Sequence, residues 1–93
     1  MHLDKIDLIC MHSKEGDVQP LRLRVTDEEG ILRVFSVKDF RDLSHHGART
    51  MPDGVCVSDK TIILECKIEI NGQDKIVRIY SNPPYLEWVM SHQ

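Results

Sequence analysis

The most reactive side chains of this chain lie in one irregular stretch, residues 42–54, which reads DLSHHGARTMPDG. A serine, Ser44, stands next to two adjacent histidines, His45 and His46, and the carboxylate of Asp42 is close by in the sequence. Serine and histidine are residue types of nucleophilic catalysis, and histidine and carboxylate side chains also bind metal ions. This stretch is therefore the first candidate for a functional site.

The spacing of these residues argues against catalysis. Ser44 and His45 are neighbours in the sequence, and neighbouring side chains seldom reach the geometry that proton transfer from serine to imidazole requires. The sequence contains no G-x-S-x-G nucleophile motif and no pair of carboxylates placed for acid–base work. We therefore expect that the protein is not an enzyme.

A histidine-based metal site is a second interpretation. Side chains of adjacent residues point apart in extended backbone, so His45 and His46 would need further ligands. These would come from Cys10, Cys56 or His12, and Cys10 and His12 are expected on the same face of one strand. However, the chain has no C-x-x-C or H-x-x-x-H spacing, and structural zinc takes four ligands. The prediction is no bound metal and no cofactor, with this site as an alternative.

The stretch also fits a loop with a purely structural role. Gly47 is expected to adopt a positive φ, and Pro52-Asp53-Gly54 has the composition of a turn with proline in its usual position. Asp42 or Ser44 would cap a short helical turn within 38–44. This interpretation explains every residue of the stretch except the pair of histidines.

The segments on both sides of the stretch alternate between apolar and polar residues, which is the period of β-strands. The alternation is clearest over 62–70, and Asn71-Gly72 follows it as a strong signal for a two-residue hairpin turn. Such a turn pairs Cys66 with Val77 inside the fold, whereas a three-residue turn would bring Ile76 inward instead.

A second hairpin is predicted near the N-terminal end, with Glu15-Gly16 as its turn. In that register Leu8 faces Leu23, and Cys10 and Ile6 also meet apolar partners. Pro20 has no N–H to donate to a ladder, so its side of the strand should be an edge or a bulge.

The third strand is expected to place Leu32 and Val34 inward if the loop before it has an even length. Its outward face would then carry Ile31, Phe35 and Val37, which is too apolar for contact with water alone. We therefore predict that these three residues form an interface with a partner protein or with a second copy of the chain, unless the long connection covers them.

Six short strands follow from these patterns, with one long connection over about 38–60. The 93 residues leave room for a single core, so residues 1–93 are expected to form one domain. We predict an all-β fold, either a small six-stranded antiparallel barrel or a half-closed sheet. Closure of the barrel would remove the exposed sheet edges that promote aggregation.

The composition excludes several classes of function. A net charge of −3 and an aromatic content of 5% disfavour nucleic-acid binding, which needs clustered cations and stacking side chains. No apolar run approaches the length of about 20 residues that spans a bilayer, and the acidic N-terminal segment is unlike a signal peptide. Three cysteines do not form a disulfide framework, so a cytoplasmic location is expected.

Residues 42–47, Asp-Leu-Ser-His-His-Gly, match the D-x-S-x-x-G motif and in this resemble PilZ domains, which are small six-stranded barrels that bind cyclic di-GMP. The resemblance implies that Asp42, Ser44 and Gly47 contact a guanine and a ribose-phosphate edge of the dinucleotide. The family's second motif, R-x-x-x-R, is missing, because Arg22-Leu23-Arg24 has a different spacing. The ligand would then lack its main cationic partner.

The run DLSHHG followed by TMPDG also resembles small all-β proteins of Firmicutes, a group without an assigned activity. This resemblance implies a compact bacterial protein and leaves its function open. The sequence as a whole predicts a non-catalytic module for protein interaction or regulation. Its working surface would be the segment Asp42, Ser44, His45, His46 and Gly47 together with the outward patch of the third strand. Cyclic-dinucleotide binding and a histidine-based metal site are the alternatives.

Overall fold

The computed structural model describes residues 2–27 and 29–92, and within them the chain forms strands and connecting turns without a helix. Eight strands follow one another along the chain: β1 (His2–His12), β2 (Val18–Thr26), β3 (Leu32–Asp42), β4 (Arg49–Thr50), β5 (Cys56–Val57), β6 (Ile62–Ile70), β7 (Gln73–Ser81) and β8 (Trp88–His92).

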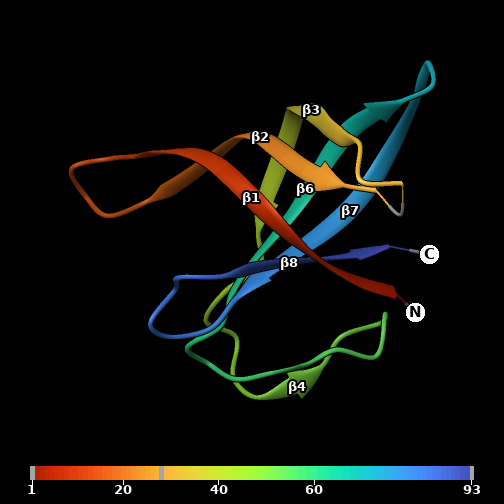
Figure 1. Ribbon diagram of the computed structural model, residues 1–93. Coiled ribbons are helices and arrows are strands. Elements are labelled where there is room, and N and C mark those ends of the chain that lie inside the picture. The colour runs from red at the N-terminus through yellow and green to blue at the C-terminus, as the bar shows by residue number, and fades with distance from the viewer. Residues whose placement is uncertain (1, 28, 93) are drawn as a thin grey trace.

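Six of the strands form a closed barrel in the order β1-β2-β3-β6-β7-β8, and β8 returns to pair with β1. Every neighbouring pair is antiparallel, so the chain runs up and down around the wall. β4 and β5, which lie between β3 and β6 in the sequence, form a separate two-stranded sheet outside the barrel wall (Figure 1). The predicted all-β fold of six antiparallel strands with one long connection is confirmed, in its closed form.

The interior of the barrel is filled by apolar side chains from all six wall strands. β6 contributes most to it, because Leu64, Cys66 and Ile68 are fully buried at alternate positions. Leu23 of β2 and Ile79 of β7 are equally buried. Burial of an aliphatic side chain of this size contributes about 1.5–3 kcal/mol, so this layer is the main source of stability.

The hairpin between β6 and β7 has the predicted two-residue turn. Asn71 and Gly72 have φ angles of 51° and 79°, and Cys66 lies opposite Val77. Residues with positive φ at both central positions give the turn a twist that matches the twist of the strands. The predicted register is therefore confirmed, with Ile76 on the outside.

The hairpin of β1 and β2 follows the predicted register only near the barrel. Leu8 lies opposite Leu23 as expected, but beyond Ile9 the register shifts, and Cys10 faces Pro20. Leu21 is the extra residue of this bulge. The prediction that Pro20 lies at an edge or a bulge is confirmed, and the outer part of the hairpin extends away from the barrel (Figure 1).

The orientation predicted for β3 is wrong. Leu23 pairs with Phe35, so Phe35 and Val37 pack against the interior, whereas Leu32 and Val34 are exposed on the outside. The loop before β3 has an odd length, because Thr26 pairs with Leu32. The loop is closed by Asp27, whose carboxylate accepts the N–H of Ile31 and of Glu29 and whose own N–H donates to the carbonyl of Ile31.

This inversion removes two of the three residues from the predicted outer interface. Phe35 and Val37 face the interior, and only Ile31 remains on the surface, in the loop. A one-residue change of register exchanges the two faces of a strand, so the error follows from the length of the loop alone.

The helical turn predicted within 38–44 is also wrong. β3 continues to Asp42, which pairs with Leu64 of β6. A bulge at Lys38 resets the alternation, so that Val37 and Phe40 both pack against the core. Their spacing of three residues, which resembles helical periodicity, is produced by this bulge.

Replacing Leu23 with alanine tests the assignment of the interior. The side chain is fully buried, so Leu23→Ala is expected to lower the free energy of unfolding by about 2–5 kcal/mol, measured by urea denaturation. Leu86→Ala is the control, because that side chain is 83% exposed and its loss should change stability by less than about 0.5 kcal/mol. Equal effects of the two substitutions would contradict the assignment.

Candidate functional site

The serine of the irregular stretch extends the β3–β6 ladder. The N–H of Ser44 donates to Asp42 Oδ1 at 2.8 Å, which closes a tight turn directly after β3. The N–H of Ile63 donates to Ser44 Oγ at 2.8 Å, and the N–H of Leu43 donates to the carbonyl of Ile63, also at 2.8 Å. Ser44 is buried, and its hydroxyl takes the place of a backbone acceptor.

His45 and Gly47 are held by a single aspartate, Asp59. His45 has a φ of 64°, and its Nδ1 lies 2.8 Å from the carbonyl oxygen of Asp59. Gly47 has the predicted positive φ, at 81°, and its N–H donates to Asp59 Oδ1 at 3.0 Å. His46 is exposed. The loop is thus ordered by hydrogen bonds that its own polar groups make.

These contacts give Ser44 and His45, the candidates for nucleophilic catalysis, different hydrogen-bond partners. Ser44 bonds to Ile63 and His45 bonds to Asp59, so they do not form a serine–imidazole pair. No three His, Cys, Asp or Glu side chains among the described residues are grouped to hold a metal ion. Cys10 and His12 share a strand face as predicted, with Sγ and Nε2 3.4 Å apart.

The residues of the D-x-S-x-x-G motif already have partners within the chain. Asp42 Oδ1, Ser44 Oγ and the Gly47 N–H are each used in a hydrogen bond that shapes the loop. Cyclic-dinucleotide binding stays a prediction, and it would require these bonds to be shared or exchanged.

The remainder of the long connection covers the outer side of the barrel. Met51 and Val57 pack against Ile63 and Tyr80, which point outward from β6 and β7, and this forms a second, smaller core. The turn predicted at residues 52–54 is present, closed by a hydrogen bond from the Gly54 N–H to the Met51 carbonyl. The connection therefore has a structural role as a cover.

A polar cluster fixes this cover to the barrel. The hydroxyl of Tyr80 donates to Asp53 Oδ2 at 2.7 Å, and Arg78 Nη1 lies 3.9 Å from the same oxygen. Arg78 Nε lies 3.2 Å from Glu65 Oε2, while Glu65 Oε1 accepts a hydrogen bond from Arg41 at 2.6 Å. Only 6% of the Asp53 side chain is exposed, so its charge depends on these partners.

The surroundings of Asp53 keep it ionised. Burial raises the pKa of this carboxyl, whereas hydrogen bonds from Tyr80 and Ser91 lower it. The N–H of Val55 and the charge of Arg78 lower it further, and the net result is a pKa below the usual value. Burial and the hydrogen bond to Asp53 also raise the pKa of Tyr80, which therefore stays a neutral donor.

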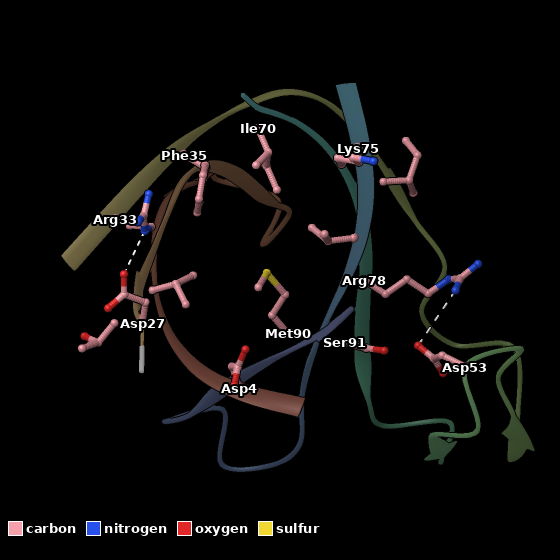
Figure 2. Close-up of a pocket in the computed structure, with 14 residues that line it drawn as sticks. Asp4, Asp27, Arg33, Phe35, Asp53, Ile70, Lys75, Arg78, Met90 and Ser91 are labelled. Carbon is pink, nitrogen blue, oxygen red and sulfur yellow. Dashed lines mark hydrogen bonds and ion pairs between the residues drawn. The ribbon is translucent and has the colours of Figure 1, made fainter. Parts of the chain in front are cut away.

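A cavity lies elsewhere, at one end of the barrel. A cavity of about 610 Å³ opens where β2, β6 and β8 end and where β1, β3 and β7 begin. In Figure 2, Phe35, Ile70 and Met90 face its centre. Val25, Ile76 and Val77 are the other apolar residues of the lining. We call this cavity the mouth of the barrel.

Four charged residues surround the apolar part of the mouth: Asp4, Asp27, Arg33 and Lys75. Asp27 Oδ2 accepts a hydrogen bond from Arg33 Nε at 3.0 Å. The N–H of Ile31 and the guanidinium of Arg33 lower the pKa of Asp27. The mouth thus combines an apolar floor with an ionised rim.

The mouth also opens sideways through the wall. β7 and β8 pair only from Arg78 opposite Ser91 to Tyr80 opposite Val89, so the first half of β7 has no partner on that side among the described residues. The cavity extends through this gap to Asp53 and Arg78, which lie beyond β7 in Figure 2. The opening gives a ligand two directions of approach.

The sequence patterns did not predict the mouth as a site. The signal that could have predicted it is a charged residue near the end of a strand, at a position whose side chain faces the interior. Lys75 lies on the same face of β7 as Val77, and Asp4 lies on the same face of β1 as Ile6. An inward charge at a strand end indicates an accessible opening, because a charge inside a filled barrel would be costly.

Comparisons of the chain with protein families, with curated proteins and with solved structures found no match. Within residues 2–27 and 29–92 there is no helix of the length and apolar character needed to cross a membrane.

Replacing Asp53 tests the polar cluster through the pH dependence of stability. The folded-state pKa lies below the usual value of 3.8, so the contribution of Asp53 is complete above about pH 4 and is lost as the pH falls through the folded-state pKa. Asp53→Asn should lower the free energy of unfolding at pH 7 by about 1–3 kcal/mol, and its difference from wild type should shrink below about pH 4.

Urea denaturation at several pH values measures this difference. The control is Asp17→Asn, in the exposed β1–β2 turn, which should follow the wild-type pH dependence. A difference between Asp53→Asn and wild type that stays constant with pH would contradict the role of the Asp53 charge.

Proposed function

We propose that the protein is a non-catalytic binding module that takes a small, largely apolar molecule into the mouth of its barrel. The observation that carries the proposal is the cavity of about 610 Å³ with an apolar floor and a charged rim. Small-molecule sites typically have volumes of roughly 300–1,000 Å³, apolar walls and a few polar groups, and they occur in the mouths of β-barrels.

The way the barrel is filled supports this location. A barrel of six strands is too narrow to enclose a ligand, since about eight strands give an interior that side chains just fill. Below the mouth, Leu23, Leu64 and Ile79 occupy the interior completely. A ligand is therefore expected to rest on the floor formed by Phe35, Val77 and Met90.

The chemistry of the lining supports binding without catalysis. The residues of the described chain that line the mouth include no cysteine and no histidine, which are common nucleophiles and general bases. The carboxylate of Asp27 is fixed by Arg33 and by two backbone N–H groups. Asp27 therefore serves to fix the loop and the guanidinium of Arg33.

The predicted regulatory role is compatible with a ligand site in the mouth. The predicted interaction surface, in contrast, loses two of its three residues. Phe35 belongs to the mouth and Val37 to the interior, so a partner protein would have to use other residues. We also place the protein in a reducing bacterial cytoplasm, a proposal supported by the free thiols of Cys10, Cys56 and Cys66.

Titration with a neutral apolar dye, Nile red, tests the proposal by fluorescence. We expect saturable binding below about 100 μM. Ile70→Trp, which adds bulk at the mouth, should weaken the binding at least tenfold. The matched control is Val34→Trp, because Val34 lies on the outer face of β3 and is half exposed.

Circular dichroism establishes that both variants keep the β-sheet fold before the comparison. Dye binding that responds equally to both tryptophans would show a site elsewhere on the surface. The absence of saturable binding to the wild-type protein would overturn the proposal.

A further inference from the structure

The charged side chains of the mouth differ in how many hydrogen-bonding groups they have left for a ligand. Asp27 Oδ1 accepts the N–H groups of Glu29 and Ile31 at 3.0 and 2.9 Å, and Asp27 Oδ2 accepts Arg33 Nε–H at 3.0 Å. Both oxygens of this carboxylate are therefore engaged. Asp27 acts as a support that fixes the loop and the guanidinium of Arg33.

The cations of the mouth retain donors that are not used. Arg33 engages only Nε in the hydrogen bonds given by the described residues, which leaves its two terminal nitrogens available. The side chain of Lys75 has no hydrogen bond or ion pair with any described residue. Both side chains line the cavity, so they can turn their donors toward a bound molecule.

The two cations and Asp4 lie at opposite sides of the mouth. In Figure 2, Arg33 and Lys75 lie on either side of Phe35 and Ile70, whereas Asp4 lies at the opposite side of the cavity. β3 and β7, which carry the two cations, are both neighbours of β6, so the cations flank a single strand. An anionic group placed above the end of β6 would face both cations at once.

We propose that the ligand of the mouth is an amphipathic carboxylate, whose apolar chain lies on Phe35, Val77 and Met90 and whose head group is held between Arg33 and Lys75. A guanidinium binds a carboxylate with two parallel N–H···O bonds, and an ammonium adds a charge without a fixed direction. This inference rests on the proposed function, because it names the class of molecule that enters the same cavity.

Calorimetric titration with three molecules of equal chain length tests the head group: decanoate, decanol and decyltrimethylammonium. Decanoate should bind the wild-type protein about three- to tenfold more tightly than decanol, and the cation should bind most weakly. The preference for decanoate should decrease as sodium chloride is raised, because the head group is held at a partly exposed rim.

Substitutions of lysine identify the residues that hold the head group. Lys75→Gln should remove most of the preference for decanoate and leave decanol binding unchanged, and Lys75→Arg should retain the preference. Lys14→Gln, in the exposed turn between β1 and β2, is the matched control with the same change in net charge and should behave like wild type.

Two results would overturn the inference without affecting the proposed function. One is binding of decanol or of the cation that equals or exceeds binding of decanoate. The other is a preference for decanoate that Lys75→Gln leaves intact. If none of the three molecules binds at about 1 mM, the inference is also overturned. Dye binding that responds to Ile70→Trp then decides separately whether the mouth binds other apolar molecules.

Discussion

The packing of the inward side chains of β6 is the interaction on which the rest of the structure depends. Leu64, Cys66 and Ile68 meet side chains from the other wall strands and exclude water from the interior. This layer holds β3 and β7 on either side of β6, and the wall strands extend past it at one end. The mouth is the space that remains there, and its charges stand at strand ends because the interior has no room for them.

The burial of apolar side chains also explains the irregular stretch, residues 42–54. A barrel built from six short strands leaves the outer faces of β6 and β7 apolar at Ile63 and Tyr80, and the long connection returns across them to cover both. Its polar residues, including Ser44 and Asp53, are used to hold the connection in place. Reactive residue types thus occur together here because an ordered connection with little regular secondary structure needs many side-chain hydrogen bonds.

The sequence predicted those features of the fold that depend on residues close to one another in the chain. The β6–β7 register followed from Asn71-Gly72, and the bulge opposite Cys10 followed from the missing N–H of Pro20. The face of β3 could not be predicted in this way, because it depends on whether the loop closed by Asp27 has an odd or even length. The mouth requires strands distant in the sequence, such as β3 and β7, to be placed on either side of β6, which the alternation of each strand does not specify.

In this interpretation the mouth of the barrel is the working surface and the histidine-containing connection is structural. Backbone amide chemical shifts, followed by NMR during titration with decanoate, distinguish these two regions. We expect shifts concentrated at Val25, Arg33, Phe35, Ile70 and Val77, with little change at residues 42–47. Shifts centred on residues 42–47, with the amides around the mouth unchanged, would contradict it.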